Sequence, residues 1–457
     1  MDRFRFLTAG ESHGQALGVT IEGVPAGLAL DQDGIATDLA RRQLGYGRGA
    51  RQAIEHDRAE ILAGVRHGFT LGSPILLIVR NRDWENWTSV MQVAALSDDE
   101  AATLAALADD GNKRAMPVTR VRPGHADLAG ALKYGFSDVR NVLERASARE
   151  TAARVAAGAV ARTFLRELGV EIRSYTAEVG GVAFDRANAT RTVEETEASP
   201  LRCPDPEAEQ RMVARIDEAR SAGDTVGGVF EVVATGVPIG LGSYVHWDRR
   251  LDAALAAAIA SINIVKGVEF GLGFEQTRVF GSQVHDVIEG RDGGAWRHRT
   301  NNAGGLTGGV SNGEPIVVRG AVKPISTLAR PLPSADLVSG LAVDKAHYER
   351  SDISVVPATG VVGEAMVALT LARFALEKLG GDSMAEVLDA LERHRGRLAA
   401  AGVSPAAGDR RGGHARVLAG SGDDGGRPGG AGVSPDEPGG QAGLEEGAGV
   451  FGSGGDD

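Results

Sequence analysis

Residues 146–168 read ASARETAARVAAGAVARTFLREL and predict one long amphipathic helix. Its apolar side is formed by Val155, Val160, Phe164 and Leu165. Ser147 is suited to cap the first turn, because Glu150 follows it three residues later as in a capping box. We therefore expect a helix that begins near Ser147 and packs by its apolar side.

The segments on either side of this helix mix helical and strand patterns. Helical spacing recurs at residues 33–44, 251–262 and 383–398. Runs of strand type lie at residues 17–22, 74–80, 228–237, 277–285, 315–322 and 353–363. Strands and helices do not alternate in units of one length, which disfavours a TIM barrel. The order predicts an α+β fold.

The composition limits the classes of partner. The chain has 457 residues, of which 42% are hydrophobic, and 49 Lys and Arg stand against 61 Asp and Glu for a net charge of −12. Such an acidic chain is poorly suited to nucleic acid or to an anionic membrane surface. Anionic ligands would have to bind at local basic clusters. We expect no nucleic acid and no membrane among the partners.

The cysteine content and the N-terminus favour a cytoplasmic protein. Cys203 is the single cysteine, so an intramolecular disulfide is excluded, which suits a reducing compartment. The start, MDRFRFLTAGES, lacks an apolar run long enough for a signal peptide. No segment reaches the roughly 18 consecutive apolar residues typical of a membrane span.

Residues 401–457 differ in composition from the rest of the chain. They contain 19 Gly in 57 positions and 9 acidic against 4 basic residues, which gives a local net charge of −5. Few large apolar residues are present to offset the entropy of ordering the glycines. We expect a single catalytic domain over residues 1–400, followed by a disordered acidic tail.

Two histidines lie in turn-like, glycine-containing motifs. His13 lies in Gly-Glu-Ser-His-Gly at 10–14, where a turn would expose its ring for proton transfer to a leaving oxygen. His125 follows Pro-Gly between basic residues, and Asp127 could orient its ring. The alternative for each is an incidental histidine in a surface turn.

Four further clusters have the composition of anion or cofactor sites. The first cluster is a glycine-rich segment that contains Arg41, Arg42, Arg48 and Arg51. It fits either a phosphate clamp or a solvated arginine-rich loop. The segment 144–151 places arginines at a helix N-terminus, and 300–313 is a glycine-dense loop without the Gly-Lys-Ser/Thr of a P-loop. Residues 350–352 place a cation beside a carboxylate. Together they indicate a site for a multiply anionic small molecule, with no cluster of metal-ligand type.

Seven motifs in this order resemble the chorismate synthase family. They are GESHG at 10–14, RRQLGYGRGAR at 41–51, RPGHAD at 122–127, ERASARET at 144–151, NNAGGLTGG at 301–309, KPIST at 323–327 and RSD at 350–352. The resemblance implies an enzyme that eliminates phosphate from 5-enolpyruvylshikimate 3-phosphate in a 1,4-elimination to give chorismate. It also implies a requirement for reduced FMN, a layered sandwich with helices between antiparallel sheets, and a homotetramer.

The resemblance also implies roles for individual residues. His13 would donate a proton to the substrate phosphate, His125 would supply one to the reduced flavin, and Asp352 would accept a hydrogen bond from flavin N5 and help to remove the C6 proton. Arg42 and Arg48 would line the anionic pocket or bind the NADPH phosphate. Flavin contacts would come from Arg145, Ala146, Ser147, Asn263, Ile264, Gly308, Lys323, Pro324, Ile325, Ser326, Thr327 and Arg350.

Two of these flavin positions depart from the family pattern. Ile264 is larger than the alanine expected there, and Ala146 replaces a serine. No nicotinamide-binding fingerprint is present, which favours an external flavin reductase over intrinsic reduction by NADPH.

Two alternative functions remain at this level. One is a flavin-binding protein without catalysis, against which His13, His125 and Asp352 all count. The other is an ATP-dependent phosphotransferase, which lacks the phosphate-binding lysine motif.

Overall fold

The computed structural model describes residues 3–49, 57–290, 296–349 and 352–403. Residues 1–421 form one compact unit, and the second unit, 422–457, lies outside the described residues. The tail expected from residue 401 therefore lies almost wholly outside them, as does Arg350.

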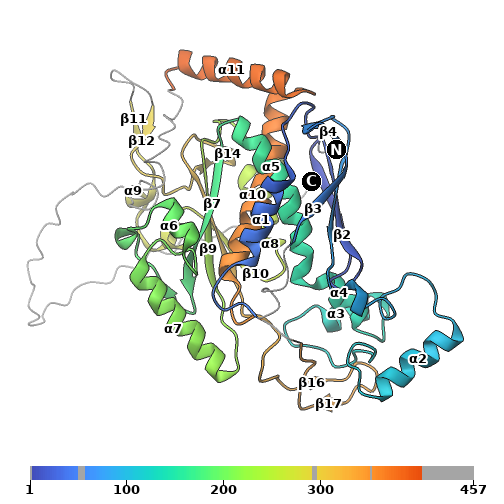
Figure 1. Cartoon of the computed structure of the whole chain (residues 1–457). Coiled ribbons are helices and arrows are strands. Elements are labelled where there is room, and N and C mark those ends of the chain that lie inside the picture. The colour runs from blue at the N-terminus through green and yellow to red at the C-terminus, as the bar shows by residue number, and fades with distance from the viewer. Residues whose placement is uncertain (1–2, 50–56, 291–295, 350–351, 404–457) are drawn as a thin grey trace, which may run out of the picture. The chain divides into compact units, whose positions relative to one another are not determined.

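Two larger antiparallel sheets carry most of the strands of this unit, and four two-stranded sheets lie beside them in the described structure (Figure 1). The first has the order β1 (Arg5–Ala9), β2 (Ala16–Glu22), β6 (Ile75–Arg80) and β3 (Ala59–Ala63). The second has the order β10 (Val265–Phe270), β15 (Ile316–Val322), β9 (Gly228–Thr235), β7 (Glu171–Val179) and β8 (Val182–Ala183). Burial alternates along β2 and β6, so the first sheet turns one face to the core.

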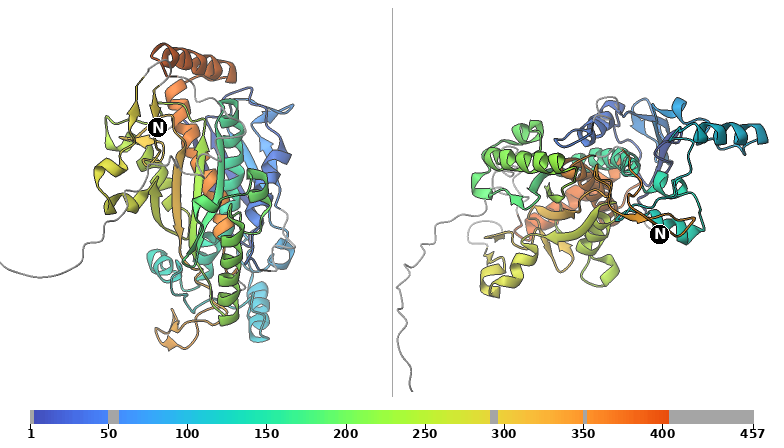
Figure 2. Two further views of the ribbon diagram at one scale, coloured as in Figure 1. Left: turned by 90° about the vertical axis from the view of Figure 1, so that its left-hand side faces the viewer. Right: turned by 90° about the horizontal axis from the view of Figure 1, so that it is seen from below.

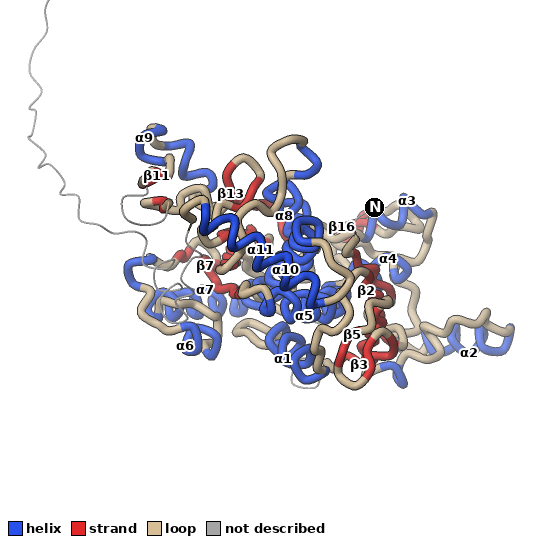
Figure 3. Tube along the Cα trace, turned by 90° about the horizontal axis from the view of Figure 1, so that it is seen from above, coloured by secondary structure: helices blue, strands red, loops and turns tan. Residues whose placement is uncertain are grey.

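Three helices lie between these sheets: α1 (Gln32–Gln43), which is buried on one side, and the mostly buried α5 (Thr151–Glu167) and α10 (Val356–Leu379). Helix α5 contacts β1, β2 and β6, and α10 contacts α5 on one side and β7 and β9 on the other. Figure 2 and Figure 3 show the helices between the sheets from three further directions. The α+β class is confirmed.

Helix α10 corrects the prediction of a strand at 353–363. Pro357 occupies the first turn, where its missing N–H costs nothing, and the valines that suggest a strand continue a 24-residue helix. Gly360 and Gly363 allow a close approach to β7 and β9, since a Cβ on either would lie within 3 Å of Ser174 or Phe230. Burial on nearly every side outweighs the weak helix propensity of valine.

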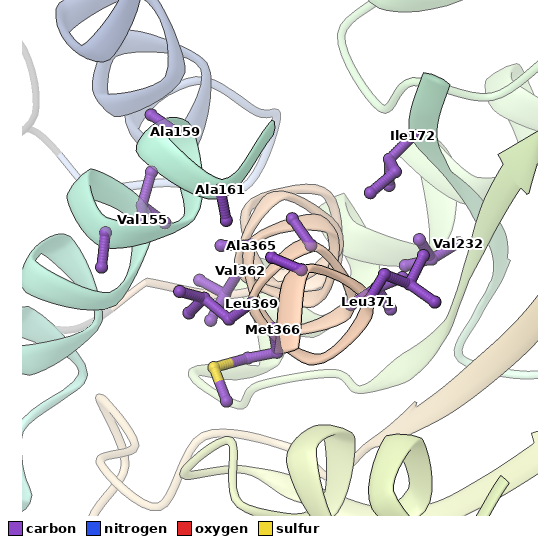
Figure 4. Packing of buried hydrophobic residues seen from close by; sticks show 14 of the residues in the cluster. Val155, Ala159, Ala161, Ile172, Val232, Val362, Ala365, Met366, Leu369 and Leu371 are labelled. Atoms are coloured by element: carbon purple, nitrogen blue, oxygen red, sulfur yellow. The ribbon is translucent and has the colours of Figure 1, made fainter. Parts of the chain in front are cut away.

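Helix α10 is long and apolar enough to cross a membrane, with a mean hydropathy of 1.4 over 18 residues. It contains no run of 18 consecutive apolar residues, because Glu364 and two glycines interrupt the apolar sequence. Within the described structure, 94% of that window is buried by protein. Figure 4 shows Val362, Ala365 and Leu369 on the side of this helix that faces α5, and Leu371 on the side of the sheet residue Val232.

The strand predicted at 277–285 is also wrong. This segment forms the end of the 3₁₀ helix η6 (Gly273–Arg278) and the short helix α9 (Gly281–Val284). Val279 and Phe280 between them are exposed, and of the apolar residues in this segment only Val284 is buried.

The predicted capping box at Ser147 is replaced by a tighter arrangement. Ser147 caps the 3₁₀ turn η3 (Ala148–Glu150) by accepting from the Arg149 N–H, and α5 begins only at Thr151. The predicted helices at 33–44, 251–262 and 383–398 are present as α1, α8 (Leu251–Ala260) and α11 (Met384–Ala400).

Further elements surround this core. They are α2 (Asp98–Asp109), α3 (Asp127–Tyr134), α4 (Arg140–Ala146), α6 (Val193–Ala198), α7 (Pro206–Ala222), β4 (Val65–Arg66), β5 (Phe69–Thr70), β11 (Ile288–Glu289), β12 (Arg297–His298), β13 (Leu306–Thr307), β14 (Val310–Ser311), β16 (Ser334–Ala335), β17 (Ala342–Val343) and the 3₁₀ helices η2 (Trp84–Asn86), η4 (Arg186–Asn188) and η5 (Trp247–Arg249).

A buried ionic cluster joins α1, α5 and α10. Arg41 and Arg162 donate to Glu364 and Asp38 over distances of 2.6–3.1 Å. Burial alone would raise the pKa of Glu364, but the two guanidinium groups outweigh burial and hold that pKa at about 2. Arg41 therefore does not belong to a phosphate clamp, because its charge is engaged inside the helical layer.

Candidate active site

The GESHG motif forms the connection between β1 and β2 and lies against α4. Gly10 has a φ of 106°, and a Cβ there would lie 2.4 Å from the Ala16 carbonyl oxygen. The Ser12 N–H donates to the Glu144 carbonyl oxygen at 2.9 Å, and the Ser147 hydroxyl donates to the Ser12 hydroxyl at 3.2 Å. Two motifs that are 130 residues apart in the sequence therefore form one surface.

His13 is buried, contrary to the expectation of an exposed turn, with 8% of its surface accessible. Its Nδ1 lies 2.9 Å from Glu144 Oε1, and its backbone N–H donates to Glu144 Oε2 at 2.8 Å. The ring stacks on Trp87 with 4.0 Å between ring centroids. The imidazole is thus fixed at one edge and on one face.

His125 forms a second pair with a carboxylate, as its spacing from Asp127 predicts. Nδ1 lies 2.5 Å from Asp127 Oδ1, and Arg122 donates to both oxygens of this carboxylate at 2.8 and 3.0 Å. Burial tends to raise the pKa of Asp127, but His125 and Arg122 together hold it well below its usual value. Asp127 therefore stays ionised and orients the ring.

The RPGHAD motif packs against KPIST. Arg122 Nη1 lies 3.4 Å from the Thr327 hydroxyl, and the Ser326 hydroxyl donates to the Gly124 carbonyl oxygen at 3.0 Å. The Lys323 ammonium donates to Ser326 at 3.2 Å. Partial burial, with Lys266 nearby, lowers the pKa of Lys323.

A further pair of hydrogen bonds connects KPIST to the α4 motif. The Lys323 N–H donates to the Ile264 carbonyl oxygen, and the Asn263 amide donates to the Ala146 carbonyl oxygen, each at 3.0 Å. Ser147 then reaches Ser12 beside His13. The predicted flavin positions at 145–147, 263–264 and 323–327 thus form a continuous series between the two histidines.

Arg145 holds the start of this series together. Its guanidinium donates to the carbonyl oxygens of Thr8 and Gly10 at 3.1 Å. It therefore fixes the end of β1 relative to the C-terminus of α4, whatever else it contacts.

The carboxylate of Glu349, to which the sequence patterns assigned no role, lies beside both histidine motifs. Glu349 Oε2 lies 3.7 Å from Arg122 Nη1, and Glu349 Oε1 lies 3.3 Å from His347 Nε2. Burial tends to raise the pKa of Glu349, but His347, Arg122 and His13 lower it to about 2. Its position directly before the RSD motif was the available signal.

The arginine-rich loop meets the RSD segment. Arg48 Nε lies 3.4 Å from Asp352 Oδ2, and the Gly49 N–H donates to Asp352 Oδ1 at 2.6 Å. Arg42 lies deeper and donates to the Thr151 hydroxyl and to the Ala148 carbonyl oxygen at 2.9 and 3.0 Å. Arg51 and Arg350 lie outside the described residues.

Gly308 is not brought to the other flavin positions. It lies in the turn between β13 and β14, with a φ of 61°, and the neighbouring Gly309 carbonyl oxygen accepts from Leu251 at the start of α8. Asn263 follows the other end of α8. The ten residues of this helix rise about 15 Å.

A surface pocket of about 360 Å³ lies elsewhere. Its lining includes Tyr46, Glu197, Arg202 and Pro357, and neither histidine motif contributes to it. The candidate site therefore consists of the motifs that the hydrogen bonds described above connect.

Comparison with known proteins gives one consistent family. The family model described as chorismate synthase matches residues 4–376. The chain is 56% identical over 403 residues to a chorismate synthase of Desulforudis audaxviator, which covers 87% of this chain and 98% of that protein. A chorismate synthase of Chlorobaculum tepidum is 52% identical over 404 residues, with 86% and 98% covered. A crystal structure of chorismate synthase aligns with a TM-score of 0.66 at 42% identity, over 86% of this chain and 98% of that one.

Proposed function

This chain belongs to the chorismate synthase family, and from that premise we propose which residues perform the reaction and what they bind. The protein is a lyase of the shikimate pathway that eliminates phosphate from 5-enolpyruvylshikimate 3-phosphate to give chorismate. The observation that carries the residue assignment is the pair of histidines, each with Nδ1 on a buried carboxylate, at the two ends of one series of hydrogen bonds.

His13 is the proposed donor of a proton to the departing phosphate. Glu144 and Trp87 hold the ring, so its orientation is set before substrate arrives. Arg48 and Arg42 are the proposed cations of the anionic pocket, where fixed guanidinium groups would stabilise charge that grows on the phosphate.

The family requires reduced flavin, and the residues present fit FMN. Among the described residues, the half-buried Lys323 ammonium has hydroxyl and carbonyl partners and no carboxylate, so its charge suits a phosphate group. Residues 145–147, 263–264 and 323–327 would hold the cofactor, together with Arg350. Reduced FMN would supply electron density to the allylic system as phosphate leaves.

His125 and Asp352 are the proposed groups at the flavin. The Asp127 carboxylate holds the His125 ring through Nδ1 and so orients it for proton transfer. Asp352 is fixed by Arg48 and the Gly49 N–H, so that its carboxylate can accept a hydrogen bond and assist the loss of the substrate C6 proton.

A homotetramer with the layered sandwich of the family is the proposed assembly. Exposed aromatic residues support it, since Tyr244, Trp247 and Phe280 are 74–83% accessible in the single chain. Light scattering of the purified protein tests this assembly.

We further propose a cytoplasmic location and an external flavin reductase. Oxidation of NADPH by the pure protein with FMN would contradict the need for a reductase.

An anaerobic assay tests the function itself. The purified protein is mixed with 5-enolpyruvylshikimate 3-phosphate and chemically reduced FMN, and both phosphate and chorismate are measured. We expect equal amounts of the two products and none with oxidised FMN. A protein that binds FMN and forms neither product would be a flavin-binding protein without this activity.

A further inference from the structure

We propose that Glu144 is a positioning residue that fixes the His13 ring, with a hydrogen on Nδ1, for proton transfer. This inference rests on the proposed role of His13 as the proton donor. Nothing in the sequence assigned Glu144 a role, although it begins the ERASARET motif.

Among the described residues, the Glu144 carboxylate contacts one residue by hydrogen bonds, His13, and one cation, Arg140. Oε1 and Oε2 lie 2.9 and 3.1 Å from His13 Nδ1, and Oε2 also accepts from the His13 backbone N–H at 2.8 Å. Arg140 Nη1 lies 3.6 Å from Oε1. Only 2% of Glu144 is accessible, so solvent does not replace these contacts.

This arrangement dictates which ring nitrogen carries a hydrogen. A carboxylate only accepts hydrogen bonds, so the Nδ1 that faces it carries one. An imidazolium held at Nδ1 can donate its second proton from Nε2, as an acid for a departing phosphate must.

Trp87 fixes the plane of the ring. It stacks on His13 at 4.0 Å with 24° between the planes, and its Nε1–H donates to Asp83 at 2.9 Å. The guanidinium groups of Arg114 and Arg140 lie 5.5 and 5.3 Å from the Trp87 ring centroid. Among the described residues, the charged groups near His13 include Glu144 and Arg140 on α4 and Glu349 before the RSD motif.

The substitution Glu144→Gln separates charge from shape. A glutamine whose oxygen takes the place of Oε2 still accepts from the His13 N–H, but its NH₂ then lies at Oε1, 2.9 Å from Nδ1. That NH₂ is a donor and cannot accept from Nδ1, so only the oxygen at the Oε2 position, 3.1 Å from Nδ1, could still accept the ring hydrogen, and it already accepts from the backbone N–H. The ring would be held less firmly, and its tautomer would no longer be fixed. The side-chain volume is nearly unchanged.

We expect Glu144→Gln to lower kcat about 100-fold at neutral pH, the scale of a lost proton donor. KM for the substrate should change much less, because the substitution keeps the size of the side chain. Nearly wild-type kcat from pH 6 to 9 would overturn the proposal.

Glu209→Gln is the matched control. Glu209 is also buried, accepts from the backbone N–H of Leu201 at 3.1 Å and pairs with Arg191 at 2.7 Å, but it has no part in the site. We expect wild-type kcat for this variant. If both variants lose kcat to the same degree, with matching falls in melting temperature, Glu144 has a structural role only and the proposal fails.

A measurement without turnover separates this proposal from the proposed function. Histidine labelled with ¹⁵N gives a signal for the Nδ1–H of His13, which His13→Gln identifies by its loss. We expect this signal in the wild type and its absence in Glu144→Gln at pH 7. Its persistence in Glu144→Gln would overturn the proposal, whereas a wild type that makes no chorismate would overturn the proposed function alone.

Discussion

At the scale of single residues, the same arrangement of a histidine and a buried carboxylate occurs twice in the site. His13 and His125 each place Nδ1 on a buried carboxylate, and those carboxylates, Glu144 and Asp127, each have an arginine within 4 Å. The arginine lowers the cost of burying the carboxylate, and the carboxylate fixes the ring. Both histidines are thereby prepared for proton transfer before any ligand binds.

We predict that His13→Ala and His125→Ala each lower kcat by about 100-fold or more, because each removes a positioned proton donor. Steady-state assays with reduced FMN measure the effect. His246→Ala is the control: His246 also places its Nδ1 on a carboxylate, Asp248, but it is exposed. Near-normal turnover in either site variant would contradict the assigned role.

The ionic cluster predicts a dependence of stability on pH. The pKa of Glu364 falls from 4.5 to about 2 on folding. Its contribution to stability is therefore complete above about pH 4.5 and is lost as the pH falls towards 2. Urea unfolding at a series of pH values should show the free energy of unfolding declining across this range.

Glu364→Gln tests the same group at neutral pH. It leaves Arg41 and Arg162 buried with less compensating charge, so we expect a loss of about 3–5 kcal/mol in the free energy of unfolding at pH 7. The variant should also lack the Glu364 share of the decline below pH 4.5. A loss below about 1 kcal/mol, the range of surface ion pairs, would mean that the cluster does not hold the helical layer together.

At the scale of elements, the contact between α5 and α10 is closest at Gly158. A Cβ there would lie 2.3 Å from the Ala365 Cβ and 2.6 Å from its Cα, closer than real side chains approach. The small residues along α5 therefore set the separation of the two helices, and with it the positions of the motifs at the N-terminus of α5.

We predict that Gly158→Ala destabilises the protein by about 1–3 kcal/mol through overpacking, although alanine favours helix. Gly396→Ala in α11 is the matched control, since a Cβ there meets nothing within 4 Å. That variant should gain up to about 1 kcal/mol. The denaturant midpoints of the two variants are compared. Equal shifts would show that the α5–α10 contact accommodates the added methyl group without loss of stability.

At the scale of the whole molecule, the site draws on segments from one end of the domain sequence to the other. Its contacts come from residues between Thr8 and Asp352, and the family model ends at residue 376. The core between the two sheets holds these segments in place, while the site itself is built from loops and helix ends.

We therefore predict that removal of residues 404–457 leaves kcat, KM and the melting temperature unchanged. Assays of the truncated and full-length proteins side by side measure this. A large loss of activity would show that the glycine-rich segment takes part in the reaction or in assembly.

The sequence alone determined the family and the α+β class and indicated the candidate site residues, because motif identity and order are properties of the chain itself. Tertiary structure decided what depends on burial and on distant neighbours. The valine-rich run at 353–363 became helix α10, because its surroundings are apolar on nearly every side. Arg41 turned inward to Glu364 across 323 residues of chain. Glu144 met His13 across 131 residues, a contact that local spacing cannot reveal, because only the packed core brings β1 and α4 together.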